Sequence, residues 1–194
     1  MKLFSTLYDK TLEWSRHRKA PWILSVLSFT ESSFFPIPPD VMLAPMALVD
    51  RHKAWFFALL TTLSSVAGAV LGYVIGLFLF EQIGQPVIDF YHAQEAFETV
   101  KRWFIEYGVW IIFIAGFTPI PYKLFTITSG VMAMALMPFL VASLIGRGAR
   151  FFLVAGLVYF FGEKVETHLK RHIDSIGWAI LALLGLFIVY RTVI

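Results

Sequence analysis

The sequence has 194 residues, of which 58% are hydrophobic and only 15% are charged. A soluble domain carries about 45–50% apolar and about 25% charged residues, so this composition excludes an ordinary soluble protein and predicts an integral membrane protein. The absence of cysteine excludes disulfides, thiolate nucleophiles and cysteine metal sites. The net charge of +3 does not indicate a nucleic-acid partner, because the positive residues flank apolar segments.

The N-terminal residues 1–20 combine five Lys or Arg with apolar residues at near-helical spacing. This pattern predicts an amphipathic helix lying in the membrane interface, with a frayed terminus as the alternative. The following residues, 21–194, are predicted to form a single all-α membrane domain.

Residues 21–49 are apolar but are interrupted by Pro36, Pro38 and Pro39. Each arm of about fourteen residues would rise roughly 20 Å as a helix, which is short of the ~30 Å hydrocarbon core. Proline also removes a backbone donor and obstructs the preceding turn. The segment therefore predicts a re-entrant hairpin, whose broken backbone must be covered by protein or line a wet cavity.

Residues 54–80 carry no charge and predict a spanning helix. Gly68, Gly72 and Gly76 recur every four residues, and Ser64 lies on the same stripe. Such a smooth face favours close approach of another helix.

A polar segment at 81–107 predicts an amphipathic loop with a short helix from residue 93 to 107. Residues 137–162 and, near the lower length limit, 175–190 predict two more spanning helices. His168 and His172 lie four apart between them, but no third ligand is evident, so no metal site is predicted.

Residues 108–135 repeat the first broken pattern, with Pro119 and Pro121 at the interruption. The run Pro36–Val41 aligns without a gap on Pro119–Leu124, at an offset of 83 residues. We therefore expect two equivalent re-entrant hairpins with these prolines at their tips.

The positive residues in the predicted loops divide ten to three, with the larger number on the side of the N-terminus. The positive-inside rule then predicts a cytoplasmic N-terminus, most simply in a bacterial inner membrane. In this topology the first hairpin opens to the cytoplasm and the second to the opposite side. That arrangement is an inverted-topology repeat, in which sites lie near the midplane at the repeat interface.

Ionisable residues inside apolar segments are costly, at about 2.5–3.5 kcal/mol each on insertion scales, and they indicate a polar interior site. The sequence has five: Glu31, Asp40, Lys123, Arg147 and Arg150. Asp40 and Lys123 occupy equivalent repeat positions with opposite charge, so we expect them to lie close together at the two tips.

These residues suggest roles in transport. Glu31, Asp40 and Lys123 are candidates for transport and proton coupling, since burial raises the pKa of a carboxyl group. Arg147 and Arg150 lie three apart on one helix face, which suits a phosphate headgroup together with Lys123. The alternative is that the two arginines are buried partners of the two acids. No catalytic or cofactor motif is present, so we predict no enzyme, no cofactor and no metal.

Two motifs resemble a known membrane family. They are Gly116-Phe117-Thr118-Pro119-Ile120-Pro121-Tyr122-Lys123 and Gly146-Arg147-Gly148-Ala149-Arg150-Phe151, which follow the early Glu31 and the first proline-rich tip. Over roughly residues 20–165 the chain resembles the DedA family, also called the SNARE-associated or VTT-domain family, and within it the short YqaA-like branch.

The resemblance implies two facing re-entrant hairpins and lipid translocation by a flippase or scramblase. In the family this means undecaprenyl phosphate in bacterial members and phospholipids in eukaryotic relatives, with proton-motive-force dependence in several members. By position, Glu31 and Asp40 match the family's membrane acids, and Lys123 matches the second basic residue of its proline-centred motif. The chain departs from the family where Phe117 and Thr118 replace the first arginine of that motif and where Lys replaces Arg at 123.

The sequence therefore predicts a transporter of a lipid or lipid phosphate. A proton-coupled transporter of small solutes or ions and a membrane scaffold without transport are the alternatives. The partners are the bilayer and the lipid substrate, and a homo-oligomer is left open.

Overall fold

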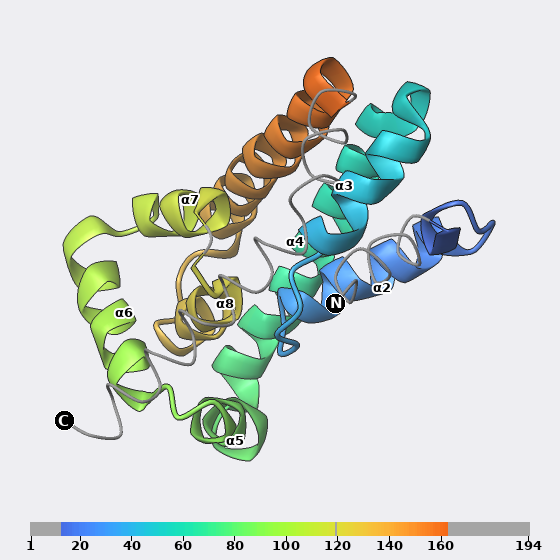
Figure 1. The fold of residues 1–194 in the computed structure, drawn as a ribbon. Helices are drawn as coiled ribbons and strands as arrows, with labels where there is room; N and C mark the ends of the chain where they lie inside the picture. Colours follow the sequence, from blue (N-terminus) through green and yellow to red (C-terminus); the bar gives the residue numbers. More distant parts are fainter. Residues whose placement is uncertain (1–12, 119, 163–194) are drawn as a thin grey trace, which may run out of the picture.

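The computed structural model describes residues 13–118 and 120–162, and every regular element in this part of the chain is helical (Figure 1). Most of the predicted interfacial helix, the charged segment with its two histidines, the last spanning helix and Pro119 lie outside the described residues. Of the predicted interfacial segment, residues 13–15 are helical.

The first broken segment forms two short helices, α2 (Ala20–Glu31) and α3 (Asp40–Val49). Their 12 and 10 residues rise about 18 and 15 Å, so neither helix alone crosses a ~30 Å hydrocarbon core. The backbone amides of Ser33, Phe34 and Phe35 all donate to the Thr30 carbonyl and close the end of α2. The three prolines lie between the two helices, which confirms the predicted helix break.

The first long helix, α4 (Ala54–Phe78), follows a short 3-10 turn at Arg51–Lys53. The combined run Arg51–Phe78 is long and apolar enough to cross a membrane. This confirms the predicted helix at 54–80.

Three short elements follow α4: a π-helical turn at Phe80–Gly84, α5 (Gln85–Phe90) and α6 (Gln94–Tyr107). The predicted helix from residue 93 to 107 corresponds to α6, whereas α5 was not predicted. In α6 the apolar side chains of Phe97, Val100 and Phe104 are buried, as its amphipathic pattern requires.

The second broken segment forms α7 (Trp110–Phe117) and α8 (Tyr122–Val131). It is followed by a long helix, Leu136–Gly162, hereafter helix 136–162, which is also long and apolar enough to span. In both broken segments a helix starts directly after a proline, at Asp40 after Pro39 and at Tyr122 after Pro121. The two segments are therefore alike in structure as well as in sequence.

The glycine face of α4 lies against α2 and α8, as predicted. A Cβ at Gly68 would meet the backbone of Phe29 in α2, and a Cβ at Gly76 would meet the backbone of Ile127 in α8. Gly72, between them, faces Thr126 of α8. The small residues thus let two short helices from different repeats approach the same long helix.

Two apolar clusters stabilise the fold on either side of the proline breaks. One joins α4, α6, α7 and α8 through residues such as Tyr73, Ile112 and Phe125, and the other joins α2, α3, α4 and helix 136–162 through Leu24 and Leu43. Many other large apolar side chains point outward. Examples with more than half of their surface exposed are Trp22, Phe56, Leu63, Phe78, Val141 and Leu157. An apolar exterior of this kind suits a lipid environment.

Candidate functional site

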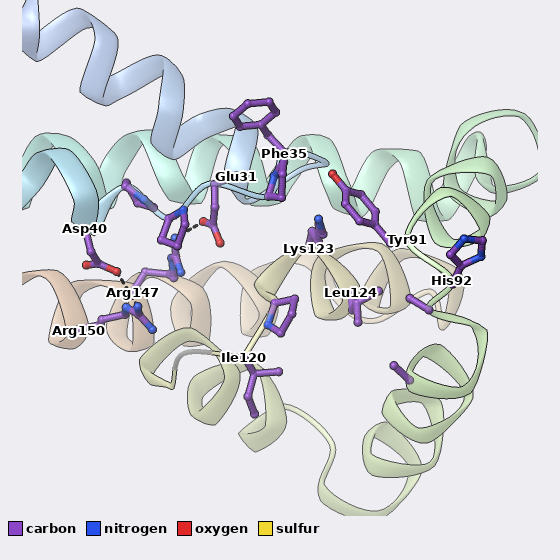
Figure 2. A pocket seen from close by; sticks show the side chains of 16 residues that line it. Glu31, Phe35, Asp40, Tyr91, His92, Ile120, Lys123, Leu124, Arg147 and Arg150 are labelled. Atoms are coloured by element: carbon purple, nitrogen blue, oxygen red, sulfur yellow. Dashed lines mark hydrogen bonds and ion pairs between the residues drawn. The ribbon is translucent and has the colours of Figure 1, made fainter. Parts of the chain in front are cut away.

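A cavity of about 500 Å³, hereafter the central cavity, lies where the two proline breaks meet helix 136–162 and the turn after α5 (Figure 2). Its lining residues are Glu31, Phe35, Pro36, Pro38, Pro39, Asp40, Tyr91, His92, Ala93, Ala96, Ile120, Pro121, Lys123, Leu124, Arg147 and Arg150. The five ionisable residues predicted to lie inside the membrane are all in this set. Segments more than 110 residues apart in the sequence thus form a single polar site.

Each acid of the first broken segment pairs with one arginine of helix 136–162. Glu31 forms an ion pair with Arg147, and Asp40 Oδ2 lies 2.6 Å from Arg150 Nη2. Both arginines are therefore ion-pair partners of the acids, as that alternative expected, and their binding of a phosphate headgroup stays a prediction. Asp40 pairs with Arg150 and not with Lys123, contrary to our expectation, because helix 136–162 runs beside the first break and presents both guanidinium groups to it.

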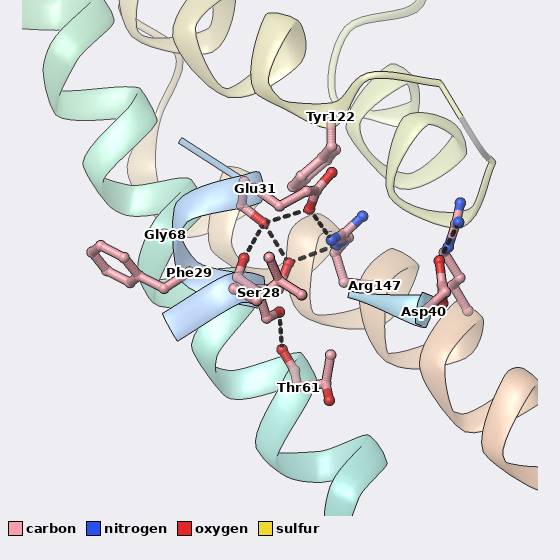
Figure 3. A network of polar contacts seen from close by, with 12 residues as sticks. Ser28, Phe29, Glu31, Asp40, Thr61, Gly68, Tyr122 and Arg147 are labelled. Carbon is pink, nitrogen blue, oxygen red and sulfur yellow. Dashed lines mark hydrogen bonds and ion pairs between the residues drawn. The ribbon is translucent and has the colours of Figure 1, made fainter. Parts of the chain in front are cut away.

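Arg147 is the most enclosed of the charged residues, with 3% of its side chain exposed. Its Nε donates to Ser65 Oγ of α4 at 2.6 Å, and Ser65 shares a 2.7 Å hydrogen bond with Ser32, which in turn donates to Glu31 (Figure 3). The ion pair is therefore part of a network that links three segments of the chain. Such partners are what a buried charge pair needs to offset its desolvation.

The guanidinium of Arg147 also lies between two aromatic rings. Its central carbon is 4.9 Å from the ring centre of Tyr122 and 4.6 Å from that of Phe151. Tyr122 is fully buried, and its hydroxyl donates to Ser143 at 2.7 Å. These contacts hold the side chain in place, so Arg147 has little freedom to follow a moving substrate.

Arg150 connects the two proline breaks. Its Nη1 donates to the Thr118 carbonyl of the second break at 2.6 Å, while its Nη2 donates to Asp40 at the start of α3. Two buried polar atoms of this pair, Asp40 Oδ1 and Arg150 Nε, have no hydrogen-bond partner among the described residues. Buried polar atoms are normally satisfied, so these two atoms are exceptions in the described part of the chain.

Lys123 has 7% of its surface exposed and forms no ion pair within the part of the chain that the structure describes. Its Nζ lies 3.3 Å from the ring centre of Tyr91, which stands in the turn between α5 and α6. The hydroxyl of Tyr91 donates to the Phe34 carbonyl of the first break at 2.9 Å. The next residue, His92, has a φ of 49°, a left-handed conformation that reverses the chain there.

The formal charges lining the central cavity are two carboxylates and three cations, which leaves a net charge of +1. A cavity with excess positive charge attracts an anion. Arginine and lysine side chains that converge on one space suit a phosphate group in particular. Among the described residues no group of three or more His, Cys, Asp or Glu could hold a metal ion.

Among the residues that contact the charged side chains of this site, Ser32, Ser65, Tyr91 and Tyr122 were not predicted as site residues. Ser65 follows Ser64, which the sequence pattern placed on the glycine face. It precedes Gly68 by three positions, so helical spacing also puts it on that face. Nothing in the sequence near Tyr91 indicated that its ring would cover a lysine 32 positions further along the chain.

The chain is similar in sequence to proteins of one membrane domain family. Residues 37–160 match the VTT domain. An uncharacterised protein of Haemophilus influenzae is 46% identical over 94% of this chain and 95% of its own length, and a protein of Histophilus somni is similarly related. Undecaprenyl phosphate transporter A of Staphylococcus aureus is 32% identical over 62% of this chain and 64% of its own length. No solved structure matches the chain significantly.

Proposed function

The chain belongs to the VTT-domain, or DedA, family of membrane proteins, and on that premise we propose that it is a transporter that moves a lipid or lipid phosphate through the central cavity. The observation that carries the proposal is the convergence of Lys123, Arg147 and Arg150 on one cavity between two proline breaks. The relative named as an undecaprenyl phosphate transporter supports a substrate with a phosphate headgroup and an isoprenoid chain.

We further propose that both broken segments are re-entrant hairpins of an inverted-topology repeat in a bacterial inner membrane, with the N-terminus in the cytoplasm. The position of the cavity along α4 supports this. Ser65, which contacts Arg147, is the twelfth of the 25 residues of that helix, so the cavity lies near the middle of a spanning helix. Irregular backbone at such depth must be covered by protein or line a wet cavity.

The two arginines then have different roles. Arg147 is held by Glu31, Ser65 and two rings, and it fixes the positive potential of the cavity. Arg150 and Lys123 are the contacts for the headgroup: the first keeps 19% of its side chain exposed, and the second has no ion-pair partner among the described residues.

The test is a reconstituted liposome assay with a fluorescent phospholipid and a polyprenyl phosphate. Arg150→Gln and Lys123→Gln should each slow translocation about tenfold or more, since a charge-assisted hydrogen bond contributes about 1.5–3 kcal/mol. Arg102→Gln, an exposed arginine on α6, is the matched control and should leave the rate unchanged. Movement of neither lipid above empty vesicles would contradict the proposal.

A second candidate is proton-coupled transport of a small solute or ion, which the two enclosed acid–arginine pairs favour. In that case collapse of the pH gradient abolishes uptake, and Glu31→Gln mimics the collapse. Uptake that is indifferent both to the pH gradient and to Glu31→Gln would exclude it.

A further inference from the structure

A second cavity lies away from the central cavity, at the start of α4. Its volume is about 550 Å³, and it is formed by the turn that precedes α2 and the turn that joins α3 to α4. We name it the rim cavity and define it by Arg16, Arg18, Lys53, Asp50, Phe56 and Phe57, which are among its lining residues. None of these residues lines the central cavity.

The rim cavity is basic. Arg16, Arg18 and Lys53 face a single acid, Asp50, so its formal net charge is +2 with His17 counted as neutral. Lys53 Nζ lies 2.7 Å from Asp50 Oδ2, and this hydrogen bond holds the pKa of Asp50 below its usual value. Asp50 therefore stays ionised and remains paired with Lys53. Among the ion pairs of the described residues, none joins Arg16 or Arg18 to an acid.

The turn that carries these arginines is ordered by its own hydrogen bonds. The amides of Arg16 and His17 donate to the carbonyls of Glu13 and Trp14, and the amide of Ala20 donates to the carbonyl of His17. The two arginines are thus presented by a closed turn next to the start of α2.

Apolar surface adjoins the charge. Phe56 and Phe57 line the cavity, and the neighbouring face of α2 holds a hollow of about 490 Å³ lined by Lys19, Trp22, Ile23 and Val26. Trp22 is 76% exposed, which is unusual for so large an apolar side chain in water and usual at a membrane interface. A ligand that fits both surfaces has an anionic head and a hydrocarbon chain.

The depth of the rim cavity agrees with this ligand. Lys53 precedes Ser65, which marks the central cavity, by twelve residues, and twelve helical residues rise about 18 Å. Half of a ~30 Å hydrocarbon core is about 15 Å. With the central cavity at mid-membrane, the rim cavity lies at the level of the lipid headgroups.

We propose that the rim cavity binds an anionic phospholipid of the surrounding leaflet, with the headgroup phosphate on Arg16 and Arg18 and an acyl chain along Trp22 and Val26. This inference rests on the proposed mid-membrane position of the central cavity. It concerns a resident lipid at the edge of the protein, separate from the substrate that crosses it.

The test compares binding of phosphatidylglycerol and phosphatidylcholine to the full-length protein by native mass spectrometry and by the shift in melting temperature in nanodiscs of each lipid. The double variant Arg16→Gln, Arg18→Gln should lose about thirtyfold in its preference for phosphatidylglycerol, because each of the two basic residues near an anionic surface contributes about 1 kcal/mol. Arg16→Lys, Arg18→Lys keeps the charge and should keep the preference. The matched double control Lys101→Gln, Arg102→Gln, on α6, should also keep it.

An unchanged preference in the glutamine variant, or an equal loss in the α6 control, would overturn the inference. Inorganic phosphate is the second arm: if it stabilises the protein as much as the lipid does, the site takes the free ion and the lipid proposal is wrong. Arg150→Gln separates this site from transport, since it should slow translocation about tenfold or more and leave the phosphatidylglycerol preference intact. Absence of translocation in the parent protein, with the preference intact, would instead count against the proposed function alone.

Discussion

Two arginines one helical turn apart show how strongly the surroundings of a side chain decide its role. Arg147 is enclosed by Glu31, Ser65 and two aromatic rings, whereas Arg150 keeps 19% of its side chain exposed and bridges the two breaks. The first arrangement stabilises the fold, and the second leaves a guanidinium that a ligand can reach.

Arg147→Gln should therefore cost more stability than Arg150→Gln. Removing Arg147 leaves Glu31 as a buried charge without its partner, and breaking such a pair costs about 3–5 kcal/mol. The double variant Glu31→Gln, Arg147→Gln should recover part of the loss, because no charge then remains unpaired. Thermal unfolding in detergent measures this, and equal destabilisation by the two single arginine variants would contradict the assignment.

Tyr91 should control access to Lys123. A cation–π contact contributes about 0.5–2 kcal/mol and must be given up when the amine turns to a phosphate. Tyr91→Ala should therefore tighten binding of a phosphate-bearing lipid analogue about fivefold, whereas Tyr91→Phe keeps the ring and should bind like the parent. Titration of the purified protein gives both affinities. Weaker binding in Tyr91→Ala would show that the ring positions the lysine for its ligand and does not compete with it.

Among the helices, α4 has the central position, because α2 and α8 from the two broken segments both lie against its glycine face. Close approach of these backbones lets Ser32 and Ser65 share a hydrogen bond and places Thr126 within 3.0 Å of the Ser32 carbonyl. The geometry of the central cavity therefore depends on Ser32, Ser65 and Thr126, although none of these residues lines the cavity.

Gly68→Ala should destabilise the protein, since the added Cβ would collide with the backbone of Phe29 and overpacking of this kind costs about 1–3 kcal/mol. Gly148→Ala is the matched control in helix 136–162, where the added Cβ would lie at an ordinary 3.6 Å from Thr62. It should be neutral or stabilising by up to about 1 kcal/mol, as alanine favours a helix over glycine. The melting temperatures of the two variants are compared directly. Equal values would show that α2 and α4 can move apart without loss of stability.

For the molecule as a whole, the inverted-topology proposal makes a prediction about sidedness. The chain has no cysteine, so single cysteines can be labelled without background. His52 lies at the start of the first spanning run, Glu95 lies in α6 beyond the other end of that run, and both residues are exposed. An impermeant maleimide added to intact cells should label Glu95→Cys, whereas His52→Cys should react only after the membrane is permeabilised. The reverse pattern would invert the proposed topology, and labelling of both would exclude it.

The sequence by itself determined the membrane class, the two long helices, the breaks at the prolines and the five charged residues of the site. These features are local. Hydropathy, proline and helical spacing depend on residues that are neighbours in the sequence, so they act in the same way wherever the segment is placed in the fold. The positions of Asp40 and Lys123 in the repeat also made both residues candidates for the site.

Only the tertiary structure decided which charges meet. Asp40 and Arg150 are 110 residues apart and Glu31 and Arg147 are 116 apart, and the pairing of Asp40 with Lys123 that the repeat predicted is not the one that forms. The outcome depends on the glycine contacts that set how closely α2, α8 and helix 136–162 approach. For the same reason the contacts of Tyr91 with Lys123 and of Ser65 with Arg147 exist only in the folded chain. The energy of a charged side chain depends on the groups that surround it in space.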